Sequence, residues 1–168
     1  MTATDFRNVQ AAHVAGLILL IAAATIGGAW IFQAFGYAPC ELCLKERIPY
    51  YVGVPVAAVA FAFAVNQSRG LTRVGFVLLF LIFAFSAGFG IYHAGVEWRF
   101  WPGPTACTGS TLTKANSVQD FLHQLQTQKV VRCDAVAIRI LGLSLAGWNA
   151  LISAVLALLA IWGLRKAA

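Results

Sequence analysis

The sequence predicts an all-α membrane protein: a bundle of four transmembrane helices with a long external loop that contains a short amphipathic helix. Of the 168 residues, 60% are hydrophobic and only 11% are charged, and the mean hydropathy is +0.78. These values lie outside the usual range of globular domains. The apolar residues also fall into four runs, each close to the roughly 20 residues that a helix needs to cross a bilayer. We expect one membrane domain over residues 1–168.

The four runs lie at about residues 12–35, 48–65, 74–92 and 145–164. His13 is the only ionisable residue of the first run, and the other three contain no Asp, Glu, Lys or Arg. Lipid offers no hydrogen-bond partner to a peptide group, so each run is expected to be a helix. The first run is longer than the apolar core of a secretory signal, which has about 7 to 15 residues. We therefore interpret it as a retained span.

Four crossings place successive connections on alternate sides of the membrane. The external loops at 36–47 and 93–144 therefore share one compartment, and the link at 66–73 faces the other compartment together with both termini. All four cysteines of the chain lie in the two external loops. Four thiols on one face suit an oxidising compartment outside the cytosol.

The distribution of positive charge also favours an orientation in which the cysteines lie outside the cytosol. Lys and Arg are denser at the termini and the short link, which the positive-inside rule assigns to the cytoplasm, although long loops carry little weight in that rule. We expect a multi-pass protein of a bacterial inner (cytoplasmic) membrane with cytoplasmic termini and periplasmic cysteine loops. The net charge is +6, but the sequence contains no run of basic residues. The charge therefore favours membrane lipid as a partner and not nucleic acid.

Cys40 and Cys43 form a Cys-x-x-Cys pair just ahead of the second apolar run. Two cysteines at this spacing can close a small, reactive disulfide, and the thiol pKa in such motifs is often lowered. Zinc is the competing interpretation, because a structural zinc site takes four ligands of this kind. Cys107 and Cys133 lack the Cys-x-x-Cys spacing, so a redox pair is favoured and no metal site is expected.

Cys107 and Cys133 have two interpretations when taken alone. A disulfide that closes a loop of about 27 residues would stabilise the fold by roughly 3.5 kcal/mol in the chain-entropy model, which makes it structural. Two cysteine pairs on one membrane face can instead exchange in series through mixed disulfides. The presence of Cys40 and Cys43 favours the second interpretation, so all four cysteines are predicted to be catalytic.

Arg47 follows Cys43 by four residues, and Pro49 favours a helix that begins close to it. A cation at the positive end of a helix dipole is favourable only beside an anion. A Cys43 thiolate or a reduced cofactor oxygen would be such an anion, so Arg47 is the predicted cofactor-binding residue. An arginine that snorkels from the span boundary to water is the common alternative.

The second external loop contains one further pattern. Val118, Phe121, Leu122 and Leu125 share one helical face, which predicts a short amphipathic helix on the membrane surface or over the bundle. The Pro-Gly-Pro sequence ahead of Cys107 breaks any helix there and favours an extended, accessible segment.

The motif PCELCLKER at residues 39–47 resembles the Pro-Cys-x-x-Cys-x-x-x-Arg signature of the DsbB family, whose members are quinone-dependent membrane proteins that generate disulfides. The segments GVEWRFWPGPTACTG (95–109) and VVRCDAVAIRILGLSLAGWN (130–149) resemble the surroundings of the second cysteine pair in this family. The similarity runs from the first span to the fourth. Quinone-linked proteins of this kind keep the bacterial periplasm oxidising.

The resemblance implies a reaction and a partner. A periplasmic thioredoxin-fold protein of the DsbA type would attack a disulfide between Cys107 and Cys133 and form a mixed disulfide with Cys107. Cys133 would then exchange with Cys40, and electrons would leave through Cys43 to a quinone, ubiquinone or menaquinone, near Arg47. The net reaction is the oxidation of a protein dithiol coupled to the reduction of a quinone.

His93 closes the third apolar run on the cysteine side. An imidazole titrates near neutrality and can hydrogen-bond or protonate a quinone oxygen. We expect a water-facing histidine at the helix end instead.

Two other classes remain open on the sequence alone. One is a thiol oxidase like vitamin K epoxide reductase, which also joins a Cys-x-x-Cys to a quinone, but with its pair near the end of a late span. The other is a non-enzymatic membrane protein stapled by disulfides.

Overall fold

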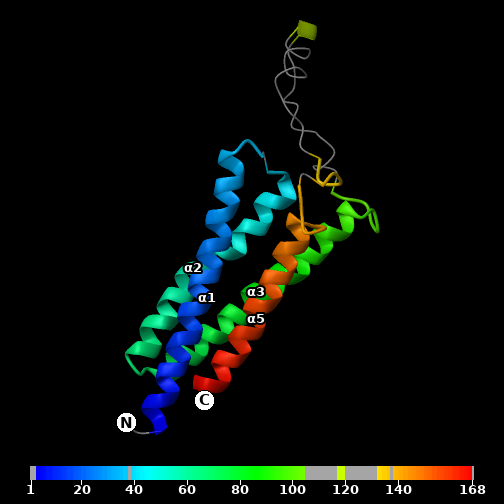
Figure 1. The fold of residues 1–168 in the computed structure, drawn as a ribbon. Coiled ribbons are helices and arrows are strands. Elements are labelled where there is room, and N and C mark those ends of the chain that lie inside the picture. The colour runs from blue at the N-terminus through cyan, green and yellow to red at the C-terminus, as the bar shows by residue number, and fades with distance from the viewer. Residues whose placement is uncertain (1–2, 38, 105–116, 120–131, 137, 168) are drawn as a thin grey trace.

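Four long helices dominate the described part of the chain in the computed structural model (Figure 1). The structure describes residues 3–37, 39–104, 117–119, 132–136 and 138–167, with the backbone only at residues 3–6. The helices are α1 (Ala3–Ala34), α2 (Glu41–Val65), α3 (Arg69–Glu97) and α5 (Leu145–Ala167). Each contains a segment long and apolar enough to cross a membrane. The predicted four-helix membrane bundle is confirmed.

The helices extend beyond the apolar runs that predicted them. α2 begins at Glu41, so residues 41–47 of the predicted loop form its first two turns and Pro49 lies inside it. The expectation that the helix starts near Pro49 is therefore wrong. α3 likewise continues to Glu97, past the predicted end at residue 92. Hydropathy marks the part of a helix that contacts lipid, whereas the backbone hydrogen bonds continue into the interfacial region.

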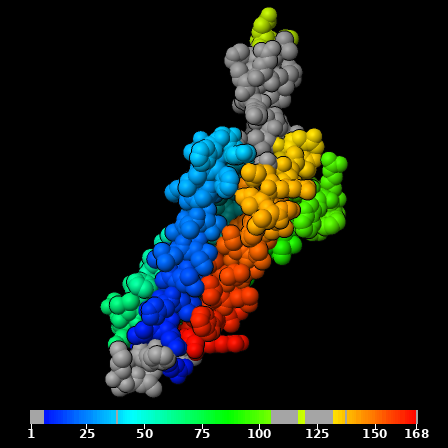
Figure 2. Space-filling view, viewed as in Figure 1, coloured from blue at the N-terminus to red at the C-terminus, as the bar shows by residue number. Residues whose placement is uncertain are grey.

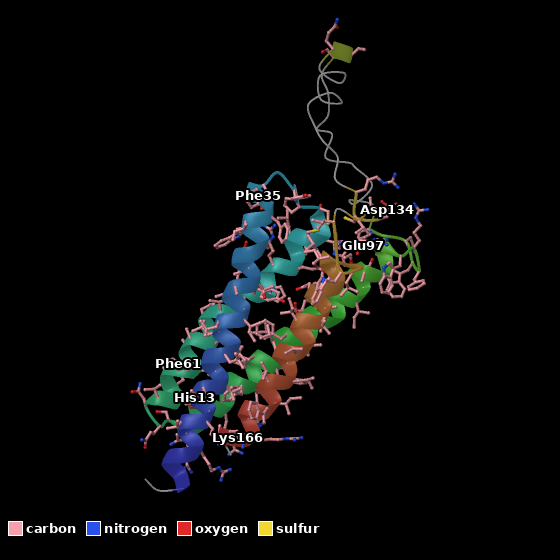
Figure 3. All side chains as sticks on the ribbon, in the orientation of Figure 1. His13, Phe35, Phe61, Glu97, Asp134 and Lys166 are labelled. Atoms are coloured by element: carbon pink, nitrogen blue, oxygen red, sulfur yellow. The ribbon has the colours of Figure 1, made fainter. Side chains whose placement is uncertain are left out.

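Both chain ends lie at the same end of the bundle, as an even number of crossings requires (Figure 1). Figure 3 places Phe35, Glu97 and Asp134 at the opposite end from His13 and Lys166. The described parts of the two external loops therefore meet at one end of the molecule.

A short hairpin leads into the last helix. Strands β1 (Arg139–Ile140) and β2 (Leu143–Ser144) pair antiparallel, and β2 is followed directly by α5. The two turn residues, Leu141 and Gly142, have positive φ angles of 52° and 83°, which is typical of a tight two-residue hairpin turn. Cys107 lies outside the described residues, and so does most of the predicted amphipathic helix, of which the structure describes only residues 117–119.

Small residues allow aromatic side chains to fill the centre of the bundle. Phe76 and Phe83 of α3 are fully buried. The Phe83 ring lies against Gly53 of α2 and the Phe76 ring against Gly163 of α5, so closely that a β-carbon at either glycine would collide with it. Close contacts at small residues are how helices pack in lipid, where no hydrophobic force drives them together.

The outer surface of the bundle is apolar along the spans. Leu20, Phe85 and Leu158 are 70%, 68% and 66% exposed. α1 and α5 lie next to one another on the face shown in Figure 2. Many exposed apolar side chains along the spans are typical of contact with a membrane.

Gly90 of α3 packs directly against the backbone of α5. A β-carbon at Gly90 would lie 2.9 Å from the backbone nitrogen of Ala150 and 3.0 Å from its Cα. We expect Gly90→Ala to lower the free energy of unfolding by about 1–3 kcal/mol, because the two helices must move apart. Thermal unfolding of the purified protein in detergent measures the change. Gly88→Ala is the matched control, since a β-carbon there meets no described atom within 4 Å; equal losses in both variants would contradict the prediction.

Candidate active site

Cys40 caps the N-terminus of α2. Its backbone is extended, and its Sγ accepts a hydrogen bond from the Cys43 backbone N–H over 3.1 Å. The first turn of a helix presents free N–H groups and the positive end of the helix dipole. Both favour a thiolate at this position. The Cys-x-x-Cys motif thus folds as a helix start, with Cys40 at the cap and Cys43 in the first turn.

The structure brings three of the four predicted cysteines to one place. Cys40 and Cys43 are free thiols, whereas Cys133 is in a disulfide. Cys40 and Cys133 belong to the same small buried cluster, together with Leu42 and Val96. All three described cysteines line one cavity.

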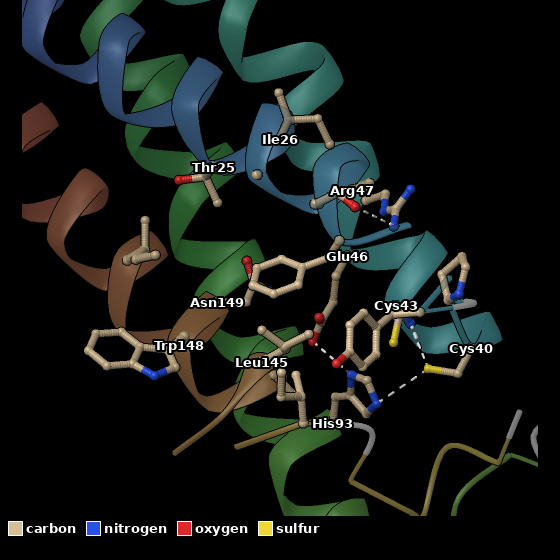
Figure 4. A pocket seen from close by; sticks show the side chains of 18 of the residues that line it. Thr25, Ile26, Cys40, Cys43, Glu46, Arg47, His93, Leu145, Trp148 and Asn149 are labelled. Atoms are coloured by element: carbon tan, nitrogen blue, oxygen red, sulfur yellow. Dashed lines mark hydrogen bonds and ion pairs between the residues drawn. The ribbon is translucent and has the colours of Figure 1, made fainter. Parts of the chain in front are cut away.

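Behind Cys40, an imidazole and a carboxylate follow in line (Figure 4). His93 Nε2 lies 3.7 Å from Cys40 Sγ, and His93 Nδ1 lies 3.0 Å from Glu46 Oε1. His93 is only 2% exposed and Glu46 only 8%. A thiol, a histidine and a carboxylate in this order are found where a base takes the proton of a thiol and a third group orients the base.

The expectation that His93 faces water is wrong. The apolar run ends at residue 92, but α3 continues for another turn to Glu97 and keeps His93 within the packed helix. Glu46 was not among the predicted site residues. The sequence does contain a signal for it. Glu46 precedes Tyr50 by four residues, and Tyr50 precedes Gly53 by three, so all three lie on one face of α2, which is buried.

The surroundings of Cys40 favour its charged form. Hydrogen bonding with Cys43 is the main cause that lowers the pKa of the Cys40 thiol to about 5; burial acts in the opposite direction, and the hydrogen bond with His93 lowers the pKa further. Since this value lies below 7, Cys40 is a thiolate at neutral pH and takes up a proton as the pH falls through about 5.

A titration of the reduced protein checks this assignment. In a Cys107→Ser/Cys133→Ser background, the ultraviolet absorbance of thiolate is expected to be present at pH 7 and to fall with a midpoint near pH 5. Adding Cys40→Ser should remove this step. A first midpoint near the ordinary cysteine pKa of about 8.5 would contradict the prediction.

Arg47 lies one turn beyond Cys43 on α2 and reaches across to α1. Its guanidinium donates hydrogen bonds to Gln33 Oε1 over 2.7 Å and to the Ala29 carbonyl over 3.4 Å. Arg47 lies in the second turn of α2, so the helix dipole acts on Cys40 more directly than on this cation. Arg47 lines the same cavity as Cys43.

The cavity has a volume of about 340 Å³ and lies among α1, α2, α3 and α5. Its lining is mostly apolar and includes Ile26, Phe32 and Ile152. Two buried polar atoms of the lining, Asn149 Nδ2 and Glu97 Oε2, have no hydrogen-bond partner among the described residues. Buried polar groups normally have a partner. The Asn149 amide interacts with the Glu46 carboxylate without a hydrogen bond of full geometry, so it can still donate to an oxygen of a ligand in the cavity. An apolar cavity with a few convergent polar groups is typical of a site for a small organic molecule.

Comparison with known proteins gives consistent matches. The family model described as "Disulfide bond formation protein DsbB" matches residues 11–163. A protein named "Disulfide bond formation protein B" from Polaromonas sp. (strain JS666) is 29% identical over 161 residues, which cover 89% of this chain and 88% of the relative. A protein of the same name from Marinobacter nauticus is 28% identical over 154 residues, 88% of each chain.

A further relative has no function in its name. An uncharacterised protein of Rickettsia prowazekii is 29% identical over 140 residues, which cover 82% of this chain and 78% of that protein. No solved structure matches this chain.

Proposed function

Because this chain belongs to the DsbB family of disulfide bond formation proteins, we propose that it oxidises a periplasmic dithiol protein and passes two electrons to a membrane quinone. Membership in the family makes it a disulfide-forming oxidoreductase of the membrane. The observation that supports the finer proposal is the position of Cys40 and Cys43: they stand at a helix start close to the buried Cys133 and line a mostly apolar cavity. A Cys-x-x-Cys at the start of the second spanning helix does not fit the vitamin K epoxide reductase-like alternative, whose pair lies near the end of a late span.

The proposed exchange conserves electrons. A partner of the DsbA type attacks the disulfide of Cys133 at Cys107, and Cys133 leaves as a thiolate. Cys133 then attacks Cys40 of a Cys40–Cys43 disulfide, and Cys43 leaves as a thiolate. When the partner's second thiol resolves its mixed disulfide with Cys107, the partner holds a new disulfide and Cys107 is released as a thiolate. Cys107 then attacks Cys133 of the Cys133–Cys40 disulfide, which restores the Cys107–Cys133 disulfide and releases Cys40 as a thiolate, so that two electrons reside on Cys40 and Cys43 near the cavity.

The cavity has the properties that a quinone head group requires. A bound quinone accepts two electrons and two protons and becomes a quinol. Ile26, Phe32 and Ile152 would contact the ring, and Arg47 and Asn149 carry N–H groups suited to a carbonyl oxygen. Ubiquinone and menaquinone share these carbonyl groups, so both suit the site.

Protons must move with the electrons. His93 Nε2 lies at 3.7 Å from Cys40 Sγ and can take the thiol proton, while the hydrogen bond with Glu46 fixes the orientation of the ring. The buried position of His93 keeps bulk water from competing for this proton.

We place the cysteine end in the periplasm and both termini in the cytoplasm. Arg165 and Lys166 lie in the last turn of α5, at the end of the bundle opposite the cysteines. Positive charge at this end favours a cytoplasmic location. Membrane-impermeant thiol reagents should label the reduced cysteine pairs only from the periplasmic side of sealed vesicles; labelling of Cys40 and Cys107 from opposite sides would exclude the relay.

Reconstitution tests the function directly. The full chain in liposomes that contain ubiquinone or menaquinone is supplied with a reduced DsbA-type protein. We expect one quinone to be reduced for each partner dithiol that is oxidised. Quinone absorbance measures the first quantity, and a count of free thiols measures the second. The proposal would be overturned if neither quinone were reduced, or if the dithiol were oxidised in the absence of quinone.

A further inference from the structure

Three ligands that soft metal ions prefer meet at the buried start of α2. The sulfur atoms of Cys40 and Cys43 and a ring nitrogen of His93 all lie within 4.8 Å of one another. Cys40 is 5% exposed and His93 2%. Thiolate sulfur and imidazole nitrogen are the common ligands of zinc in proteins.

The spacing of these atoms is close to that of a tetrahedral site. With zinc–sulfur bonds of about 2.3 Å and zinc–nitrogen bonds of about 2.0–2.1 Å, a sulfur and a nitrogen ligand stand roughly 3.6 Å apart, and two sulfurs roughly 3.8 Å apart. Cys40 Sγ and His93 Nε2 already stand 3.7 Å apart. No pair exceeds 4.8 Å, so the ligands need to close by no more than about 1.2 Å.

Glu46 prepares the histidine for this role. Its Oε1 lies 3.0 Å from Nδ1 of His93, which leaves Nε2 directed at Cys40 Sγ. A carboxylate behind a histidine ligand fixes the tautomer and raises the basicity of the ligand. The three ligand residues also line the cavity, which gives space for a water molecule as a fourth ligand.

We propose that the reduced protein binds one Zn²⁺ ion, or a similar soft divalent cation, through Cys40, Cys43 and His93. Both sulfurs coordinate as thiolates, and their two negative charges balance the charge of the buried ion. A disulfide between Cys40 and Cys43 removes both ligands, so metal binding and disulfide formation exclude each other. The ion therefore holds the pair reduced and inhibits electron transfer, and its binding does not depend on the proposed function.

The spacing of cysteines in the sequence could not reveal this site. The expectation of no metal site considered the four cysteines and found no second Cys-x-x-Cys. The third ligand is a histidine 53 residues after Cys40, and only the packing of α3 against α2 brings it to the pair.

Cobalt binding tests the proposal without any assay of activity. The full chain with Cys107→Ser and Cys133→Ser carries thiols only at Cys40 and Cys43; it is reduced in detergent without oxygen and titrated with Co²⁺. We expect one equivalent to produce a thiolate-to-cobalt charge-transfer band together with the visible bands of tetrahedral cobalt, and Zn²⁺ to displace it. Glu46→Gln should weaken binding about 10–100-fold, as the loss of a partner behind a ligand typically does.

The variants separate a three-ligand site from a simple dithiol. His93→Gln should abolish the tetrahedral bands, and His13→Gln, at the other end of the bundle, should bind like the parent. Oxidised protein should show no band. Unchanged spectra and affinity in His93→Gln, or no thiolate band in the reduced parent, would overturn the proposal. Quinone reduction by the protein with all four cysteines is measured separately, so failure of the metal site and failure of the proposed function are distinguished.

Discussion

Cys43→Ser is expected to abolish quinone reduction by a dithiol protein, leaving the rate of liposomes that contain no protein. Serine preserves the backbone N–H that Cys40 Sγ accepts, so the start of α2 is retained. No disulfide can form between positions 40 and 43, so no oxidising equivalent passes from the cavity to Cys133. The reaction is followed by the absorbance of quinone in proteoliposomes, and thermal unfolding verifies that the variant is folded.

The matched control keeps this pair and removes the other. Cys107→Ser/Cys133→Ser should still reduce quinone with a small dithiol such as dithiothreitol, which can reach the Cys40–Cys43 disulfide, and should fail with the protein partner. Cys43→Ser should fail with both reductants. If Cys43→Ser retained most of the activity of the unmodified protein, the electrons would leave by a different route.

The four spans could be predicted because bilayer thickness constrains them strongly. A segment such as 74–92 has no charged residue, and a peptide backbone in lipid has almost no alternative to a helix. The ends of the helices could not be predicted in the same way, because α2 begins about two turns ahead of its apolar run and α3 continues for more than one turn past its own. Composition reports the lipid contact and not the extent of backbone hydrogen bonding.

The start of α2 shows a second limit of prediction from the sequence. Ser, Thr, Asp and Asn are the usual N-cap residues, and Pro is common in the first turn of a helix. The first rule does not select Cys40, and the second points to Pro49. The structure has a cysteine in the cap position because its sulfur accepts the Cys43 N–H, and the same contact connects the start of the helix to the chemistry of the thiol.

The contact between His93 and Glu46 depends on how two helices pack and not on any local pattern. The two residues are 47 positions apart, and they meet only when α2 and α3 have one particular rotation and register. The close approach of the Phe83 ring to Gly53 helps to set that register. A burial pattern along one helix can suggest that Glu46 faces inward, but it cannot name the residue that it meets.

Arg47→Gln is expected to raise the apparent KM for quinone by about 10–100-fold, with a smaller effect on kcat. A hydrogen bond from a charged donor contributes about 1.5–3 kcal/mol, and each 1.4 kcal/mol is a factor of about ten in affinity. Gln33 and Ala29 hold the guanidinium beside the cavity, so the donor is oriented before a ligand binds. Initial rates at saturating dithiol and varied quinone measure the two constants.

Two further variants separate quinone binding from a structural role of Arg47. Lys45→Gln removes a positive charge from the same part of α2, where Lys45 is exposed and pairs with Glu41 over 3.1 Å; the KM should not change. Gln33→Leu removes the shorter hydrogen bond of Arg47 but leaves its charge in place, so it should raise the KM less than Arg47→Gln does. If Arg47→Gln lowered the melting temperature as much as Gln33→Leu and left the KM unchanged, Arg47 would serve only to join α1 to α2.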